Sequence, residues 1–172
     1  MLPRNNIAER CGIADRKGSR NFRGRIAIVV FLAVPLAGID LLVKAVLPTA
    51  PLFFHRRSGE WMILSAVVLV FALLLTRLPS RLLAGSAGLL AAGVLGNLVS
   101  ARLHHGLVPN PFVIVRGDFE LAFNLADLFV LGGIVLLTAA ALRLTVRYRH
   151  LLPQSTLAVR LVRRVRSLLA SG

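Results

Sequence analysis

The chain has 172 residues, 56% of them hydrophobic, and a mean hydropathy of +0.77. Soluble domains are typically about 45–50% apolar, so this composition argues against an ordinary soluble domain and favours a membrane protein. The formal net charge of +14 would suit a nucleic-acid-binding protein. The basic residues, however, border long apolar runs, which predicts contact with anionic membrane lipids and no nucleic-acid partner. The single cysteine, Cys11, excludes an intramolecular disulfide and a cysteine-based metal site.

Four apolar runs follow one another along the chain, over residues 26–47, 61–76, 82–99 and 121–142. Each is near the roughly 20 residues that a helix needs to cross about 30 Å of hydrocarbon, although the second run is short. Asp40 and Lys44 lie within the first run, which is also longer than a secretory signal, so we interpret it as an uncleaved anchor. The sequence therefore predicts an all-α membrane protein built as a bundle of four transmembrane helices.

The distribution of positive charge predicts the orientation of these helices. Of the 21 lysine and arginine residues, 16 lie before residue 26, in the loop with Arg77 and Arg81, or after residue 142. By the positive-inside rule, both termini and this loop are cytoplasmic. We expect a basic cytoplasmic tail without periodicity over residues 1–25, a membrane domain over 26–143 and a basic amphipathic cytoplasmic tail over 144–172. For the last segment two interpretations stay open, a helix lying along the inner leaflet and a partly disordered tail.

Polar residues gather at one depth in three of the predicted spans. At about 1.5 Å per residue, Asp40 and Asn97 lie roughly 21 Å from the cytoplasmic starts of their helices. Asn124 and Asp127 fall in the first turns of the fourth span, which runs inward. Ionisable groups within a membrane are costly, so this convergence predicts a shared interior site. Lys44, four residues after Asp40, can form an intrahelical salt bridge, and such a pair alone could merely stabilise the helix end.

Small residues recur every fourth position in the third span, at Gly88, Ala92 and Gly96. Because small side chains let helix backbones approach closely, this face predicts a helix-packing seam that ends at Asn97. A packing seam by itself carries no chemistry.

Read in chain order, these polar positions belong to four short segments: Asp40-Leu-Leu-Val-Lys44, Gly93-Val-Leu-Gly96-Asn97-Leu98, Arg102-Leu-His-His-Gly106 and Phe123-Asn124-Leu125-Ala126-Asp127. The segments resemble the motifs of the lipoprotein signal peptidase family, signal peptidase II, across residues 26–143. The first motif is weak alone and the last is specific. The resemblance implies a multi-pass protein of the bacterial cytoplasmic membrane. It also implies an aspartyl endopeptidase that cleaves signal peptides from diacylglyceryl prolipoproteins.

The resemblance further implies a pair of catalytic aspartates, one acting as base on water and the other polarising the scissile carbonyl. Asp127 matches one of them, and Asn110 occupies the place of the other; a shift of one residue would put Pro109 there. Neither side chain supplies a carboxylate, and an amide cannot take a proton from water. The family's substrate-binding positions correspond to Asp40, Lys44, Asn97, Arg102 and Asn124, and no cofactor or metal is implied.

Two further departures accompany Asn110. Ala101 stands where the family has an aspartate, with one additional residue between Asn97 and Arg102, and the segment 55–60 lacks the family's substrate-cradling Asn and Gly-Ala-Phe pattern. Losses at three places favour a protein that binds lipoprotein signal peptides, or a related lipidated ligand, with lost or impaired peptidase activity.

Other interpretations of the sequence remain open. One alternative is an active peptidase with an unconventional second carboxylate, Asp118 or Glu120, and another is a small membrane scaffold. His104 and His105 are adjacent but have no matching carboxylate cluster, so they are weak metal-ligand candidates.

Overall fold

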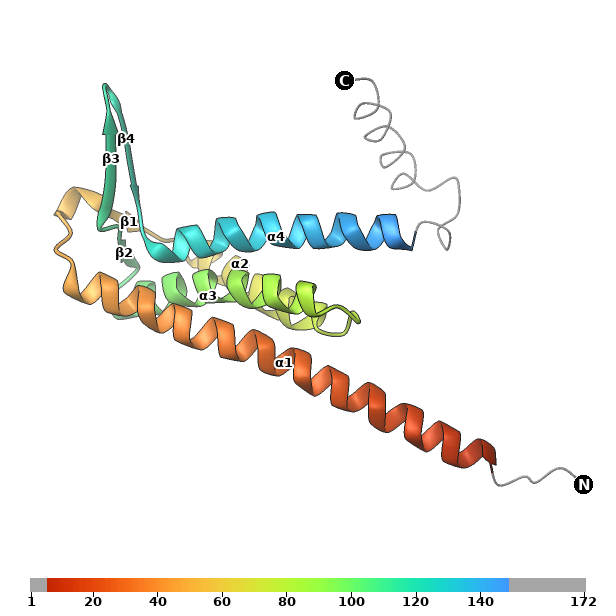
Figure 1. Cartoon of the computed structure of the whole chain (residues 1–172). Helices are drawn as coiled ribbons and strands as arrows, with labels where there is room; N and C mark the ends of the chain where they lie inside the picture. The colour runs from red at the N-terminus through yellow and green to blue at the C-terminus, as the bar shows by residue number, and fades with distance from the viewer. Residues whose placement is uncertain (1–5, 149–172) are drawn as a thin grey trace, which may run out of the picture.

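The computed structural model describes residues 6–148, with side-chain surroundings from residue 21 onward, and it consists mainly of four helices (Figure 1). Helix α1 spans Asn6–Val46, α2 Gly59–Leu75, α3 Arg81–Leu103 and α4 Leu125–Arg147. Within the described residues, α1 from Asn21 onward, α3 and α4 are long and apolar enough to cross a membrane, while α2 is a shorter apolar helix. The protein is therefore a mostly helical membrane protein.

Two helix boundaries differ from the sequence-based prediction. Helix α1 begins at Asn6, so most of the tail predicted for residues 1–25 continues the first helix. Helix α4 begins at Leu125 and not near residue 121, because Asn124 caps it and the apolar residues before the cap belong to a strand. Residues 149–172, which include most of the predicted C-terminal tail, lie outside the described part.

The prediction of an all-α fold is wrong in one respect, because the loops at one end of the bundle form two small antiparallel sheets. A short 3-10 helix, η1 (Pro51–Phe53), leads into β1 (Phe54–Arg56), which pairs with β2 (Leu107–Pro109). Strands β3 (Phe112–Arg116) and β4 (Phe119–Phe123) form a hairpin that projects away from the helices (Figure 1). Aromatic and β-branched residues such as Phe-Val-Ile-Val favour a strand. Hydropathy alone does not distinguish such an apolar strand from the first turns of an apolar helix.

Helix α3 is the centre of the bundle and lies between α1 and α4 (Figure 1). In its apolar window 67% of the residues are buried, against 22% for α1 and 17% for α4, whose outer faces expose large apolar side chains as expected for lipid contact. The predicted seam of small residues is confirmed. A Cβ on Gly88 would meet Leu32 of α1 at 3.0 Å, and one on Gly96 would lie 2.7 Å from Asp40 Oδ2.

Candidate functional site

A buried ion pair joins α1 to the other two spanning helices. Asp40 is fully buried, and its Oδ2 accepts a hydrogen bond from Lys44 Nζ at 2.7 Å. Lys44 Nζ also donates to Asn97 Oδ1 on α3 at 2.8 Å, and the backbone N–H of Ala126 on α4 donates to Asp40 Oδ1 at 2.8 Å. The absence of a side chain at Gly96 leaves room for the Asp40 carboxylate. Each charge is thus paired and hydrogen-bonded, which the membrane interior requires.

Asp127 continues this network at the start of α4. Asn97 Nδ2 donates to Asp127 Oδ1 at 2.9 Å, and the backbone N–H of Asn124 donates to Asp127 Oδ2 at 3.1 Å. In return, Asn124 Oδ1 accepts from the backbone N–H of Asp127 at 3.1 Å, which completes a capping box. The prediction that Asp40, Asn97, Asn124 and Asp127 meet in one polar cluster is confirmed.

The orientation of Asn110 follows from this helix cap. Because Asn124 Oδ1 is held by the cap, Asn124 Nδ2 is free to donate to Asn110 Oδ1, at 2.6 Å. The amide nitrogen of Asn110 then donates to the carbonyl oxygen of Ala122 at 3.1 Å and to His55 Nδ1 at 2.7 Å. This assignment makes Nδ1 of His55 an acceptor and places the imidazole proton on Nε2. Asn110 is 1% exposed, and its side chain both donates hydrogen bonds through Nδ2 and accepts one through Oδ1.

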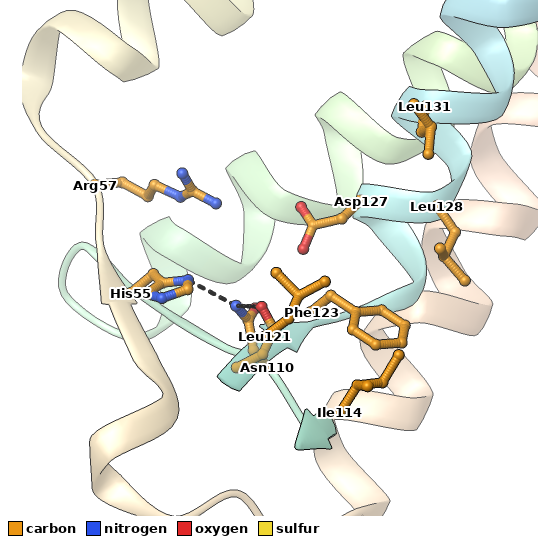
Figure 2. A pocket seen from close by; sticks show the side chains of 10 residues that line it. His55, Arg57, Asn110, Ile114, Leu121, Phe123, Asp127, Leu128 and Leu131 are labelled. Carbon is orange, nitrogen blue, oxygen red and sulfur yellow. Dashed lines mark hydrogen bonds between the residues drawn. The ribbon is translucent and has the colours of Figure 1, made fainter. Parts of the chain in front are cut away.

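Asn110 and Asp127 line one cavity of about 460 Å³ (Figure 2). His55 and Arg57 contribute from β1 and the residue after it, while apolar side chains from the hairpin and α4 form the remaining wall: Ile114, Leu121, Phe123, Leu128 and Leu131. A mostly apolar cavity with a few convergent polar groups is the usual form of a ligand site, and its size falls in the common range of about 300–1,000 Å³. The long apolar wall suits an acyl chain or an apolar peptide.

The other candidate residues occupy different places. Asp40, Lys44 and Asn97 are buried behind Asp127 and do not line the cavity, so their direct role in the structure is to hold the helices and orient that carboxylate. Arg102 is exposed near the end of α3 and does not line it either. Pro109 is also absent from the lining, so the structure brings Asn110 to the position beside Asp127.

The loop carboxylates and histidines also lie away from the cavity. Glu120 pairs with Val115 near the tip of the β3–β4 hairpin, and Asp118 lies in the turn between those strands. Neither lines the cavity. His104 Nδ1 lies 2.9 Å from the carbonyl oxygen of Ser100, and both His104 and His105 are exposed.

Sequence analysis missed His55 and Arg57 as residues of the site. Both lie in a segment that was considered only for the family pattern it lacks. They line the same cavity as Asn110 because β1 pairs with β2, with His55 opposite Val108, across more than 50 residues of sequence. No local sequence motif predicts such a pairing. Two basic residues close to Trp61 in sequence were only a weak indication that they are not simply solvated.

The fold and the site define a mostly helical membrane protein in which Asp127 is the one aspartate among the described residues that line a cavity between helices and strands. The family model of signal peptidase (SPase) II matches residues 49–143, more than half of the chain. The protein therefore belongs to the signal peptidase II family.

Comparison with solved structures gives the same fold. Two structures, described as bacterial membrane enzymes solved by the in meso method at 1.9 Å and 2.3 Å resolution, each align with a TM-score of 0.53. Sequence identity is 23% over 67% of this chain and 93% of the first structure, and 21% over 69% of this chain and 89% of the second. A search of curated proteins finds no match.

Proposed function

We propose that this protein binds the signal peptides of lipidated prolipoproteins, or a closely related acylated peptide, and has lost most of the family's endopeptidase activity. The cavity beside Asp127 supports binding, because its apolar wall and few polar groups match a membrane-embedded acylated peptide. The observation that carries the loss of activity is the hydrogen bonding of Asn110. Its amide nitrogen donates to Ala122 and to His55, so the second catalytic position holds a donor where the reaction needs a proton-accepting or proton-donating carboxyl group.

Asp127 alone supplies only part of the family's chemistry. General acid or base catalysis contributes about 10²–10⁴-fold for each positioned group. Of the described residues that line the cavity, Asp127 is the only carboxylate. The alternative with Asp118 or Glu120 as the second carboxylate would require the hairpin tip to fold back over the cavity.

The membrane arrangement proposed from charge completes this function. Both termini and the α2–α3 loop are placed in the cytoplasm of a bacterium, residues 26–143 form the membrane domain, and the cavity opens on the outer side of the cytoplasmic membrane. The flanking segments 1–25 and 144–172 contact anionic lipids. In this orientation the cavity would face the leaflet in which the lipidated cysteine of a prolipoprotein lies.

Binding is tested with a fluorescent diacylglyceryl prolipopeptide and the full-length protein in lipid nanodiscs. Leu131→Trp puts a larger side chain at the apolar wall and is expected to weaken binding, because the indole takes up cavity volume that the ligand needs. Leu136→Trp, on an exposed face of the same helix outside the cavity, is the matched control and should bind as the wild type does. Equal affinity in both variants, or no binding by the wild type, would contradict the proposal.

A further inference from the structure

Among the described residues that line the cavity, Arg57, in the loop segment before α2, is the one arginine or lysine. Its guanidinium points toward Asp127 from the opposite wall (Figure 2). The guanidinium carbon lies 4.8 Å from the ring centroid of Trp61, a cation–π contact that fixes the side chain. Arg57 is thus held in place at the cavity by an aromatic side chain in the first turn of α2.

Two observations indicate that Arg57 has donor capacity left for a guest. Its Nε atom is buried and has no hydrogen-bond partner among the described residues. Within that same part of the chain, the one salt bridge is the pair Lys44–Asp40, so Arg57 and Asp127 face each other without a direct ion pair. Buried donors are nearly always satisfied in native proteins, so an unsatisfied one on a side chain that lines a cavity indicates a missing partner.

The charges of the cavity restrict the chemistry of that partner. An acceptor atom is needed for the guanidinium, which has donors only. A phosphate or free carboxylate would bring a second negative charge to the side of Asp127, and like charges in a poorly solvated site repel. A neutral carbonyl oxygen satisfies Arg57 without this penalty, and the apolar wall beside it accommodates the chain on which the carbonyl is carried.

We propose that Arg57 anchors the bound ligand by donating hydrogen bonds to a main-chain carbonyl oxygen of an acylated peptide. The inference deepens the proposed function and rests on it. It assigns the role of substrate-contacting cation to Arg57 and not to Arg102, which is exposed outside the cavity. Arg57 acts in binding and takes no part in proton transfer.

The test compares the affinity of the diacylglyceryl prolipopeptide for three variants of the full-length protein. Arg57→Gln should weaken binding by about tenfold to a hundredfold, the usual effect of removing a charged hydrogen-bond donor. Arg57→Lys keeps the charge and lacks the planar fork, so a smaller loss is expected. Arg56→Gln removes the same charge from the exposed neighbouring strand position, and its affinity should equal that of the wild type. Thermal unfolding of each variant confirms that it is folded.

The outcomes separate this inference from the function on which it rests. If the wild type binds and both Arg57 variants bind equally well, Arg57 is not the anchor and the binding function stands. If Arg56→Gln loses as much affinity as Arg57→Gln, general electrostatic attraction explains the effect and the anchor is refuted. If the wild type does not bind the peptide, both proposals fall. A peptide with ether-linked chains lacks the ester carbonyl oxygens but keeps its main-chain carbonyls, so its affinity should still fall in Arg57→Gln. If its affinity no longer depended on Arg57, the contact would belong to the acyl ester and the proposal would be overturned.

Discussion

Replacing Asn110 by aspartate puts a carboxylate at the proposed second catalytic position, but the structure predicts that it destabilises the protein. The wild-type amide nitrogen donates to the carbonyl oxygen of Ala122 at 3.1 Å and to His55 Nδ1 at 2.7 Å. A carboxylate oxygen in that place has no proton for the carbonyl oxygen of Ala122, whereas neutral His55 can adapt by carrying its proton on Nδ1. Leaving buried polar groups unsatisfied costs about 1–3 kcal/mol, and a charged group costs more.

The stability that the protein loses in Asn110→Asp should depend on pH in a defined direction. The variant relieves the conflict by taking up a proton on the new carboxylate, because burial without a donor disfavours its charged form. The folded variant therefore binds more protons than the unfolded chain, so its free energy of unfolding rises as pH falls. Burial can raise the pKa of a carboxyl group by several units, so the change should be visible above the usual titration range of aspartate.

Thermal unfolding in detergent, followed at about pH 6 and about pH 8, measures this effect. The deficit of Asn110→Asp relative to the wild type is expected to be larger at the higher pH. Asn21→Asp, at an exposed position of α1, makes the same chemical change and should show no such dependence. A variant as stable as the wild type at both pH values, or one more stable at the higher pH, would refute the proposed orientation of the Asn110 amide.

Three further predictions concern the bundle and its orientation. Gly93→Ala should lower stability by about 1–3 kcal/mol, because its Cβ would collide with the α4 backbone. Gly85→Ala has open space at its Cβ and should unfold at or slightly above the wild-type temperature, since alanine favours a helix over glycine. Equal effects of the two changes would contradict the α3–α4 contact. Asp40→Ala leaves a buried ammonium unpaired, which costs about 3–5 kcal/mol, so the purified variant should unfold at a clearly lower temperature, and wild-type stability would show that the ion pair is dispensable. In intact cells an impermeant thiol reagent should label Ser58→Cys and spare the native Cys11, and the reverse pattern would overturn the topology.

The polar cluster could be predicted from the sequence because the membrane leaves few alternatives. Asp40, Asn97 and Asp127 lie on three helices at one depth, and each needs a partner away from lipid. Their convergence follows from helix geometry and orientation alone. The small residues of α3 were informative for the same reason, since close helix contact requires them at regular spacing.

The strands and the polar groups they carry could not be predicted in this way. Residues 121–123 are apolar and were assigned to the fourth span, although the Asn124-x-x-Asp127 capping pattern already marked the start of a helix at Leu125. His55 enters the site through the pairing of β1 with β2, which are far apart in sequence. Such pairing depends on tertiary contacts that hydropathy does not encode.

The proposed function requires that the protein binds an acylated signal peptide and does not turn it over efficiently. The direct test incubates one diacylglyceryl prolipopeptide with the wild type, Asp127→Ala and Asn110→Asp, with a family member that has both aspartates as control, and measures bound and cleaved peptide in the same samples. The account predicts binding by the wild type with cleavage slower than the control by about 10²–10⁴-fold, and incomplete recovery in Asn110→Asp. Cleavage by the wild type at the rate of the control, abolished in Asp127→Ala, would contradict it.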